Sequence, residues 1–170
     1  MKQPILKSIL FCTTLVASGL ANSAEPAIYA GGGIGSASTE LTGYKNAGSY
    51  KLFAGAKAEG FAMELSYVNL GRFKQKAGGE NSYTVDGAQL NAMADLFISK
   101  GLYGYGSFGF YNWNLDDKLA ASDSGTSLTL GLGIKVLMGN SFAVRGGWDR
   151  YQDISDSDVD MLSLNGVYQF

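Results

Sequence analysis

Apolar and polar positions alternate along most of the chain, as they do in β-strands that have two different faces. Most of the alternating segments have ten or more residues, whereas strands of globular proteins average about five or six. A strand that crosses a bilayer needs about 9–11 residues. Their length therefore favours a β-barrel in lipid over a soluble sandwich. The eight segments are Ala27–Ser38, Ser49–Ala58, Phe61–Arg72, Thr84–Ile98, Leu102–Leu115, Thr126–Met138, Phe142–Asp153 and Val159–Phe170.

The connections between these segments alternate in length. Glu59–Gly60, Ser99–Gly101 and Gly139–Ser141 are tight turns. The other four are longer and polar: Thr39–Gly48, Phe73–Tyr83, Asp116–Gly125 and Ile154–Asp158. Bacterial outer-membrane barrels have an even strand number, with short periplasmic turns and longer extracellular loops. The pattern predicts an all-β fold, an eight-stranded antiparallel up-and-down transmembrane β-barrel with both termini on the short-turn side.

The two faces of the predicted strands differ in composition. In the sixth segment the residues from Leu128 to Val136 alternate between large aliphatic side chains and Thr, Gly or Lys. The polar faces carry few charges and many glycines, which fits a narrow lumen where isolated charges pair across the barrel. Gly31, Gly33 and Gly35 are expected to keep the lumen side of the first strand small. A phosphate-binding loop at Gly31–Gly33 is disfavoured, because no Lys-Ser/Thr follows it.

The N-terminal segment, residues 1–24, has the build of a secretory signal peptide. Lys2 and Lys7 precede a short apolar run, Ile9–Val16, and small residues end the segment. Such an apolar run is too short for a membrane-spanning helix. Cleavage is expected after Ala24, with Ala21 as the second choice, and residues 25–170 then form the outer-membrane β-barrel domain.

Composition excludes several classes of function. The chain has 13 basic and 15 acidic residues. Residues 25–170 have 11 basic and 15 acidic residues, a net charge of −4, which argues against a nucleic-acid partner. The chain has no histidine, the commonest general base and metal ligand. We therefore expect no cofactor, no metal site, no catalytic residue and no enzymatic activity.

The chain stops on an alternating stretch. Leu162, Leu164, Tyr168 and Phe170 share one face of the last segment. Aromatic girdles line both rims of outer-membrane barrels. The last strand is therefore expected to close the barrel against the first, with Tyr168 and Phe170 facing outward at the periplasmic rim.

Four short stretches, in this order along the chain, resemble the OmpA-like outer-membrane β-barrels. They are Ile28–Gly31, Met63–Tyr67 with Leu70–Arg72, Gln89–Leu90 with Ala92, and Met161–Leu164 with Tyr168 and Phe170. The resemblance implies an outer-membrane barrel. Because the chain ends at this barrel, we expect a stand-alone barrel without that family's periplasmic peptidoglycan-binding domain. The resemblance also implies that Phe170, with Tyr168, is the signal read by the barrel-assembly machinery.

The resemblance further implies a lumen salt-bridge cluster that plugs or gates a narrow path. Glu64 falls on the family's strand-three glutamate and Arg145 on its strand-seven arginine. The family's lysine on strand four is Met93 here, and its glutamate on strand six is Lys135, so its switch between partners is in doubt. A second pair, Lys135 with Asp95, is a further candidate.

Charged residues outside these pairs have less specific roles. Lys57 and Asp149 are expected nearer the two rims, in contact with water. Arg72, Lys74 and Lys76 are candidates for contacts with lipopolysaccharide phosphates, with a solvated loop as the alternative. The acidic run Asp153–Asp160 is expected to form a solvated loop rather than a calcium site, because it contains no glycine to turn around an ion.

Two functions remain open. The first is a structural or surface-interaction protein of a Gram-negative outer membrane, with a plugged polar lumen, extracellular loops and a surface ligand or host factor. The alternative is a narrow ion-conducting pore gated by Glu64 and Arg145. A secreted soluble barrel that binds an apolar ligand is disfavoured by the aliphatic face of the sixth segment.

Overall fold

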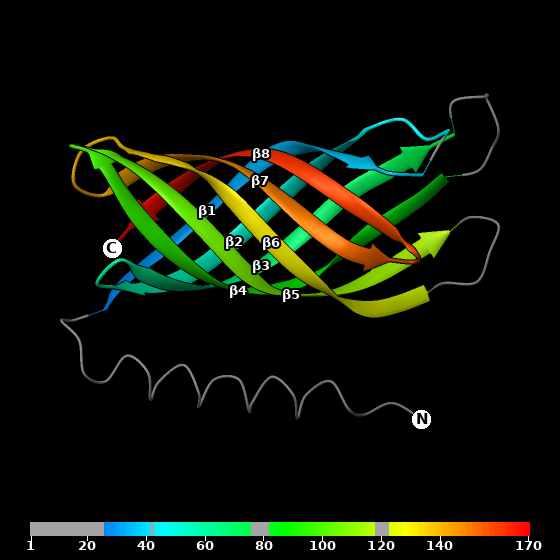
Figure 1. The fold of residues 1–170 in the computed structure, drawn as a ribbon, viewed down its shortest axis with the longest axis horizontal. Helices are drawn as coiled ribbons and strands as arrows, with labels where there is room; N and C mark the ends of the chain where they lie inside the picture. Colours follow the sequence, from blue (N-terminus) through cyan, green and yellow to red (C-terminus); the bar gives the residue numbers. More distant parts are fainter. Residues whose placement is uncertain (1–25, 42, 76–81, 118–122) are drawn as a thin grey trace.

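The computed structural model describes residues 26–41, 43–75, 82–117 and 123–170. Within these ranges the chain forms eight antiparallel strands that close into a barrel in sequence order (Figure 1). The strands are β1 (Ala27–Thr39), β2 (Ala47–Ala58), β3 (Phe61–Lys74), β4 (Ser82–Ser99), β5 (Leu102–Asp117), β6 (Asp123–Leu137), β7 (Phe142–Ile154) and β8 (Ser157–Gln169). The all-β, eight-stranded prediction is confirmed.

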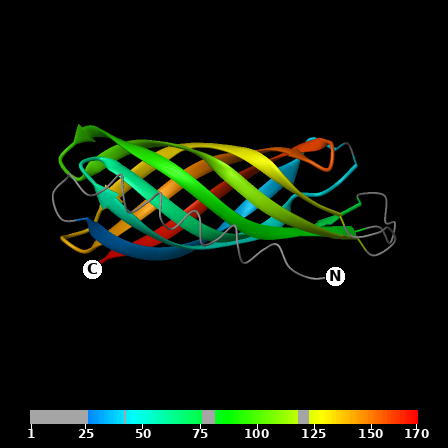
Figure 2. The same ribbon diagram turned by 90° about the horizontal axis from the view of Figure 1, so that it is seen from below.

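The barrel closes where the last strand pairs with the first. Antiparallel pairing of β1 with β8 runs from Tyr29 opposite Gln169 to Thr39 opposite Val159. The backbone N–H of Phe170 also donates to the carbonyl of Ile28 at 3.0 Å. The start of β1 and the end of β8 therefore lie at the same end of the barrel as the β2–β3, β4–β5 and β6–β7 turns (Figures 1 and 2). We call this the turn end and the opposite one the loop end.

One predicted connection is wrong. Ile154–Asp158 was expected to be a longer polar loop, but Ile154 pairs with Ser157 and leaves only two residues between the strands. Ser155 and Asp156 have φ angles of +49° and +65°. Positive φ at both central residues is the requirement of a type I′ hairpin turn. The sequence Ser-Asp lacks the glycine that usually identifies such a turn.

The outer surface is apolar. Exposed outward side chains on β6 include Leu130, Leu132, Ile134 and Val136, as the alternation predicted. Other strands add large exposed apolar residues, among them Ile34, Leu65, Phe108 and Leu164. An exposed apolar surface of this extent marks contact with lipid or another apolar partner. No helix in the described ranges is both long enough and apolar enough to span a bilayer.

The inward side of β1 is narrow, as predicted. Side chains at Gly31, Gly33 and Gly35 would overlap the neighbouring strand, β8. At Gly31 a Cβ would also come within 2.6 Å of the ring of Phe53, which lies inside the barrel. The glycines therefore leave room for the larger inward side chains of the neighbouring strands.

Candidate functional site in the barrel lumen

A network of three charged residues occupies the middle of the lumen. Glu64 on β3 is completely buried, and Arg145 on β7 is 5% exposed. Their closest atoms, Oε2 of Glu64 and Nη1 of Arg145, are 2.8 Å apart. Lys51 on β2, 4% exposed, approaches Oε1 of Glu64 with its Nζ at 3.5 Å. We call Lys51, Glu64 and Arg145 the central network.

Neutral groups complete the surroundings of Glu64. The hydroxyl of Tyr29 donates to Oε2 at 3.2 Å, and the hydroxyl of Ser66 donates to Oε1 at 3.3 Å. A buried carboxylate is costly unless charged partners and hydrogen bonds compensate its lost hydration. Here two cations and two hydroxyl groups do so. The arrangement holds one carboxylate charge in the interior of the barrel.

The guanidinium group of Arg145 lies between aromatic rings. It lies 4.4 Å from the ring centroid of Phe53 and 5.5 Å from that of Tyr105. A Cβ at Gly133 or Gly147 would overlap the hydroxyl of Tyr105, so these glycines of β6 and β7 create the space that Tyr105 fills. These ring contacts stabilise the guanidinium group in its place beside Glu64.

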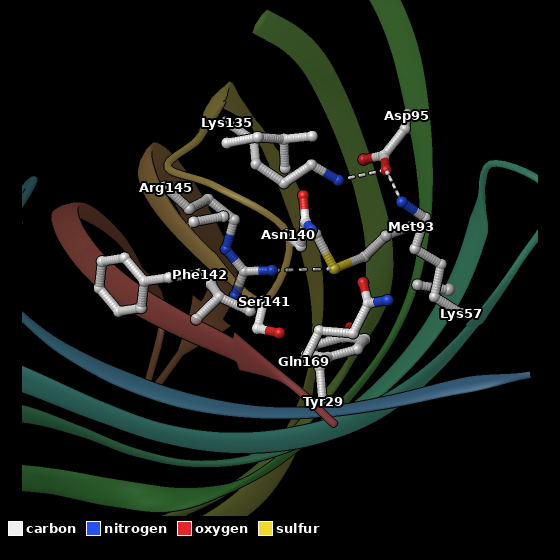
Figure 3. Close-up of a pocket in the computed structure, with 14 residues that line it drawn as sticks. Tyr29, Lys57, Met93, Asp95, Lys135, Asn140, Ser141, Phe142, Arg145 and Gln169 are labelled. Atoms are coloured by element: carbon white, nitrogen blue, oxygen red, sulfur yellow. Dashed lines mark hydrogen bonds and ion pairs between the residues drawn. The ribbon is translucent and has the colours of Figure 1, made fainter. Parts of the chain in front are cut away.

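A second charged group lies at the turn end. Lys57 on β2 and Lys135 on β6 both contact the same oxygen of Asp95 on β4, Oδ2, with Lys57 at 3.4 Å. The two ammonium groups also lie near the ring of Tyr103, at 6.0 and 5.3 Å from its centroid. Lys57, Asp95 and Lys135 border a cavity of about 60 Å³, drawn in Figure 3, which also reaches Arg145. We call this cavity the vestibule.

Apolar side chains fill the lumen at the loop end. Large members include Tyr111 and Tyr151, whose ring centroids are 4.9 Å apart, and Phe73 and Tyr83, at 5.0 Å. We call this cluster the apolar section. It consists of Ala37, Ala47, Val68, Leu70, Phe73, Tyr83, Val85, Tyr111, Trp113, Leu115, Tyr151, Ile154, Val159 and Met161.

The polar atoms of the apolar section are bonded within the protein. The Tyr111 hydroxyl donates to the carbonyl of Val68 at 3.2 Å. Nε1 of Trp113 donates to the hydroxyl of Ser127 on β6 at 2.8 Å. The polar side chains of the central network agree with the predicted polar lumen. The apolar section does not, so the prediction is wrong for the loop end. Inward aromatic residues there were overlooked, because alternation does not distinguish an apolar lumen from an apolar outer face.

The predicted site residues fall into two groups. Glu64 and Arg145 belong to the central network, while Lys135 and Asp95 lie at the vestibule. Met93, which replaces the family's lysine, accepts a contact from Nη1 of Arg145 through its Sδ at 3.5 Å. Lys51 was missed, although its place between the outward residues Tyr50 and Leu52 identifies it as inward. Its contact with Glu64 depends on the long lysine side chain inside the closed barrel, since the register places Val68 and not Glu64 opposite Lys51.

Lys57 and Asp149 were both expected near the rims, and only Lys57 lies there. Lys57 lies at the turn end and is partly exposed. Asp149 is 6% exposed and lines a small internal cavity with Glu64 and Arg145, so its expected place at a rim is wrong. Asp149 lies opposite Gly131 and Met161 in the register, well within β7.

The loop end carries charges on its outer side. Arg72 and Lys74 are exposed on β3, beyond a bulge that begins after Asn69. The N–H of Lys45 donates to the carbonyl of Lys74 at 2.9 Å, so an exposed third cation lies beside them. Lys76 lies outside the described residues, as does the expected signal peptide.

Arg150 forms ion pairs with acidic side chains of the run Asp153–Asp160. Arg150 contacts both carboxylate oxygens of Asp160 at 2.8 Å and also approaches Asp158 and Glu40. Asp153 and Asp156 are part of the tight hairpin rather than of a loop. Among the described residues, no group of three or more His, Cys, Asp and Glu side chains is arranged around a common ion position.

The C-terminal aromatic residues face outward. Tyr168 is 51% exposed and Phe170 is 77% exposed, with their ring centroids 5.2 Å apart. This is the outward orientation that alternation predicted for the last strand.

Comparison with known proteins gives the class of this chain. Residues 8–170 match the model of the outer membrane protein beta-barrel domain, so the chain belongs to that family. It is an outer-membrane β-barrel of the type found in Gram-negative bacteria. No curated protein sequence matches the chain.

Solved structures of small outer-membrane barrels have the same fold. Neisserial surface protein A superposes with a TM-score of 0.65 and 15% identity over 88% of this chain and 99% of that one. Ail, the attachment invasion locus protein of Yersinia pestis, gives 0.62 and 17% over 86% and 100%. The N-terminal barrel of Pseudomonas aeruginosa OprF gives 0.61 and 17% over 84% and 97%.

Proposed function

We propose that this protein is a non-enzymatic, non-conducting barrel with a structural or surface-interaction role. The observation that carries the proposal is the apolar section. Its residues come from β1, β2, β3, β4, β5, β7 and β8, and several of them, including Phe73, Tyr111 and Tyr151, are completely buried. An ion crossing this section would lose its hydration, with few polar groups to replace it.

The alternative is a narrow pore gated by the central network. The ion pair between Glu64 and Arg145 favours this alternative, because the pair lies in the middle of the lumen and would open a path there if it broke. The apolar section argues against this alternative. It lies between the central network and the loop end, and it would stay closed if Arg145 moved.

Single-channel conductance of the refolded chain in a planar bilayer tests the two functions. The wild type and Arg145→Ala are compared, with folding verified by heat-dependent mobility in gels. We expect no reproducible openings from either protein. Openings in the wild type that grow in Arg145→Ala would support the gated pore and contradict the proposal.

We further propose how the barrel is placed in the outer membrane. The turn end, with both strand termini, faces the periplasm, and the loop end faces outward. This placement is supported by the lengths of the connections, since outer-membrane barrels have short periplasmic turns, and three of the four connections at the loop end are longer than those at the turn end. It puts Lys45, Arg72 and Lys74 at the level of lipopolysaccharide phosphates, which accept charge-assisted hydrogen bonds from such cations. Surface ligands or host factors would then meet the loop end.

A further inference from the structure

The vestibule contains more positive than negative charge. Lys57, Lys135 and Arg145 border it, whereas Asp95 is the one acidic residue among the described residues that line it. The two ammonium groups share a single oxygen of Asp95. Figure 3 shows Lys57 and Lys135 approaching Asp95 from opposite sides, with the guanidinium group of Arg145 facing the same cavity.

The excess is not fully cancelled by the neighbouring carboxylates. The described residues that line this cavity and the adjoining internal one include four cations, Lys51, Lys57, Lys135 and Arg145, and three carboxylates, Glu64, Asp95 and Asp149, so one positive charge remains uncompensated. Asp149 lies beside the central network, on the other side of Arg145 from the Lys57–Asp95–Lys135 group. Like charges held close together in a low-dielectric region are unfavourable unless a counter-charge joins them.

Among the described residues, the lining of the vestibule differs between its two ends. Towards the loop end it is limited by Arg145, Met93 and Tyr29, beyond which lie the rest of the central network and the apolar section. At the turn end its lining includes Asn140, Ser141 and Gln169, whose side chains can donate hydrogen bonds. Ser141 and Gln169 are exposed, and Figure 3 shows both beside the cavity.

We propose that the vestibule is a binding site for a small oxyanion of the phosphate type. The anion enters from the turn end and lies between the ammonium groups of Lys57 and Lys135 and the guanidinium group of Arg145. It supplies the counter-charge that Asp95 alone does not. This site goes beyond the non-conducting role, because binding from one end requires no passage through the lumen.

Calorimetric titration of the refolded chain with inorganic phosphate tests the site, in a neutral detergent and at constant ionic strength. We expect saturable binding with one phosphate per chain. Lys57→Gln should weaken it by roughly tenfold or more, the loss expected for one charged hydrogen bond. Asp95→Asn should tighten it, because it removes the competing carboxylate. Lys100→Gln removes a cation from an exposed turn at the same end and should leave the affinity unchanged.

The opposite signs for Lys57→Gln and Asp95→Asn separate binding from damage to the fold, since a misfolded barrel would lose affinity in both variants. Titration with acetate shows whether a single carboxylate suffices. The proposal is overturned if the wild type shows no saturable phosphate binding, or if Lys57→Gln and Lys100→Gln have equal effects. Should Asp95→Asn not fold, the comparison between the two lysine variants decides.

Discussion

At the scale of single residues, the stability of the barrel depends on how the buried charge of Glu64 is compensated. The carboxylate has Arg145 at 2.8 Å and Lys51 at 3.5 Å, together with hydroxyl groups of Tyr29 and Ser66. Breaking a buried ion pair by removing one partner costs roughly 3–5 kcal/mol, because a charge is left uncompensated. With two cations present, the loss of either one leaves Glu64 with a partner.

Replacement of the two cations should therefore be cooperative. We expect Lys51→Met and Arg145→Met each to lower the free energy of unfolding by about 1–2 kcal/mol. The double variant should lose more than the sum of the two, because only then is Glu64 without a cation. Urea unfolding followed by tryptophan fluorescence measures these differences.

Arg150→Met is the control, since the pairs of Arg150 with Asp160 lie on the outer side and are partly exposed. It should cost less than Arg145→Met. Simple additivity of Lys51→Met and Arg145→Met would show that the two cations do not share Glu64, and an unchanged midpoint in both would mean that the lumen is wet.

The sequence predicts which of these side chains face inward, but it does not predict all of their contacts. Alternation places Lys51, Glu64 and Arg145 inside, because their neighbours are outward apolar residues. The resemblance to the OmpA-like barrels supplies the pairing of Glu64 with Arg145. The second partner, Lys51, does not follow from the β2–β3 register either, since Lys51 lies opposite Val68 whereas Glu64 lies opposite Gly55. Its ammonium group reaches Glu64 through the long side chain inside the closed barrel, which neither segment shows alone.

At the scale of elements, the strands were predictable and the loop end was not. All eight predicted strands are present, and most boundaries differ from the observed ones by two residues or fewer. The β7–β8 connection was misjudged, because Ser155 and Asp156 adopt positive φ without the glycine or asparagine that normally indicates it. The pairing of Ile154 with Ser157 defines the turn, in which Asp156 is of a residue type that tolerates positive φ.

A prediction at this scale concerns the end of the last strand. Phe170 is expected to be recognised by the barrel-assembly machinery, in addition to contacting lipid. Phe170→Ala should therefore lower the amount of folded protein in the outer membrane severalfold. Phe61→Ala is a matched control, because Phe61 is also an outward aromatic residue at the turn end, with 69% of its surface exposed against 77% for Phe170. Fractionated membranes and heat-dependent gel mobility give the folded amounts.

Equal amounts of the Phe170→Ala and Phe61→Ala proteins would show that Phe170 contributes no more than any other outward aromatic side chain. A selective loss for Phe170→Ala would assign the terminal residue a role in assembly that its packing against Tyr168 does not account for.

At the scale of the whole molecule, the lumen has three parts in sequence along the barrel. The vestibule lies at the turn end, the central network in the middle and the apolar section at the loop end. The first two could be anticipated in part from charges at inward positions, although Lys51 was missed and Asp149 was expected at a rim. The apolar section could not, because aromatic residues such as Tyr111 and Trp113 suit either face of a barrel in lipid. Only closure of the sheet decides which face they occupy.

The non-conducting function requires the apolar section to be closed to water, whereas the vestibule is open to it. Cysteine labelling tests this difference directly, because Cys12 is the single cysteine of the chain and can be replaced by serine. Val85→Cys introduces a thiol in the apolar section, at a completely buried position, and Ala62→Cys introduces one in the vestibule. Both refolded variants are treated with a charged, thiol-specific methanethiosulfonate reagent, and full labelling after unfolding provides the reference.

We expect rapid labelling at residue 62 and almost none at residue 85 while the barrel is folded. Comparable labelling rates at the two positions would show that water passes through the loop end of the lumen, and this would contradict the non-conducting function.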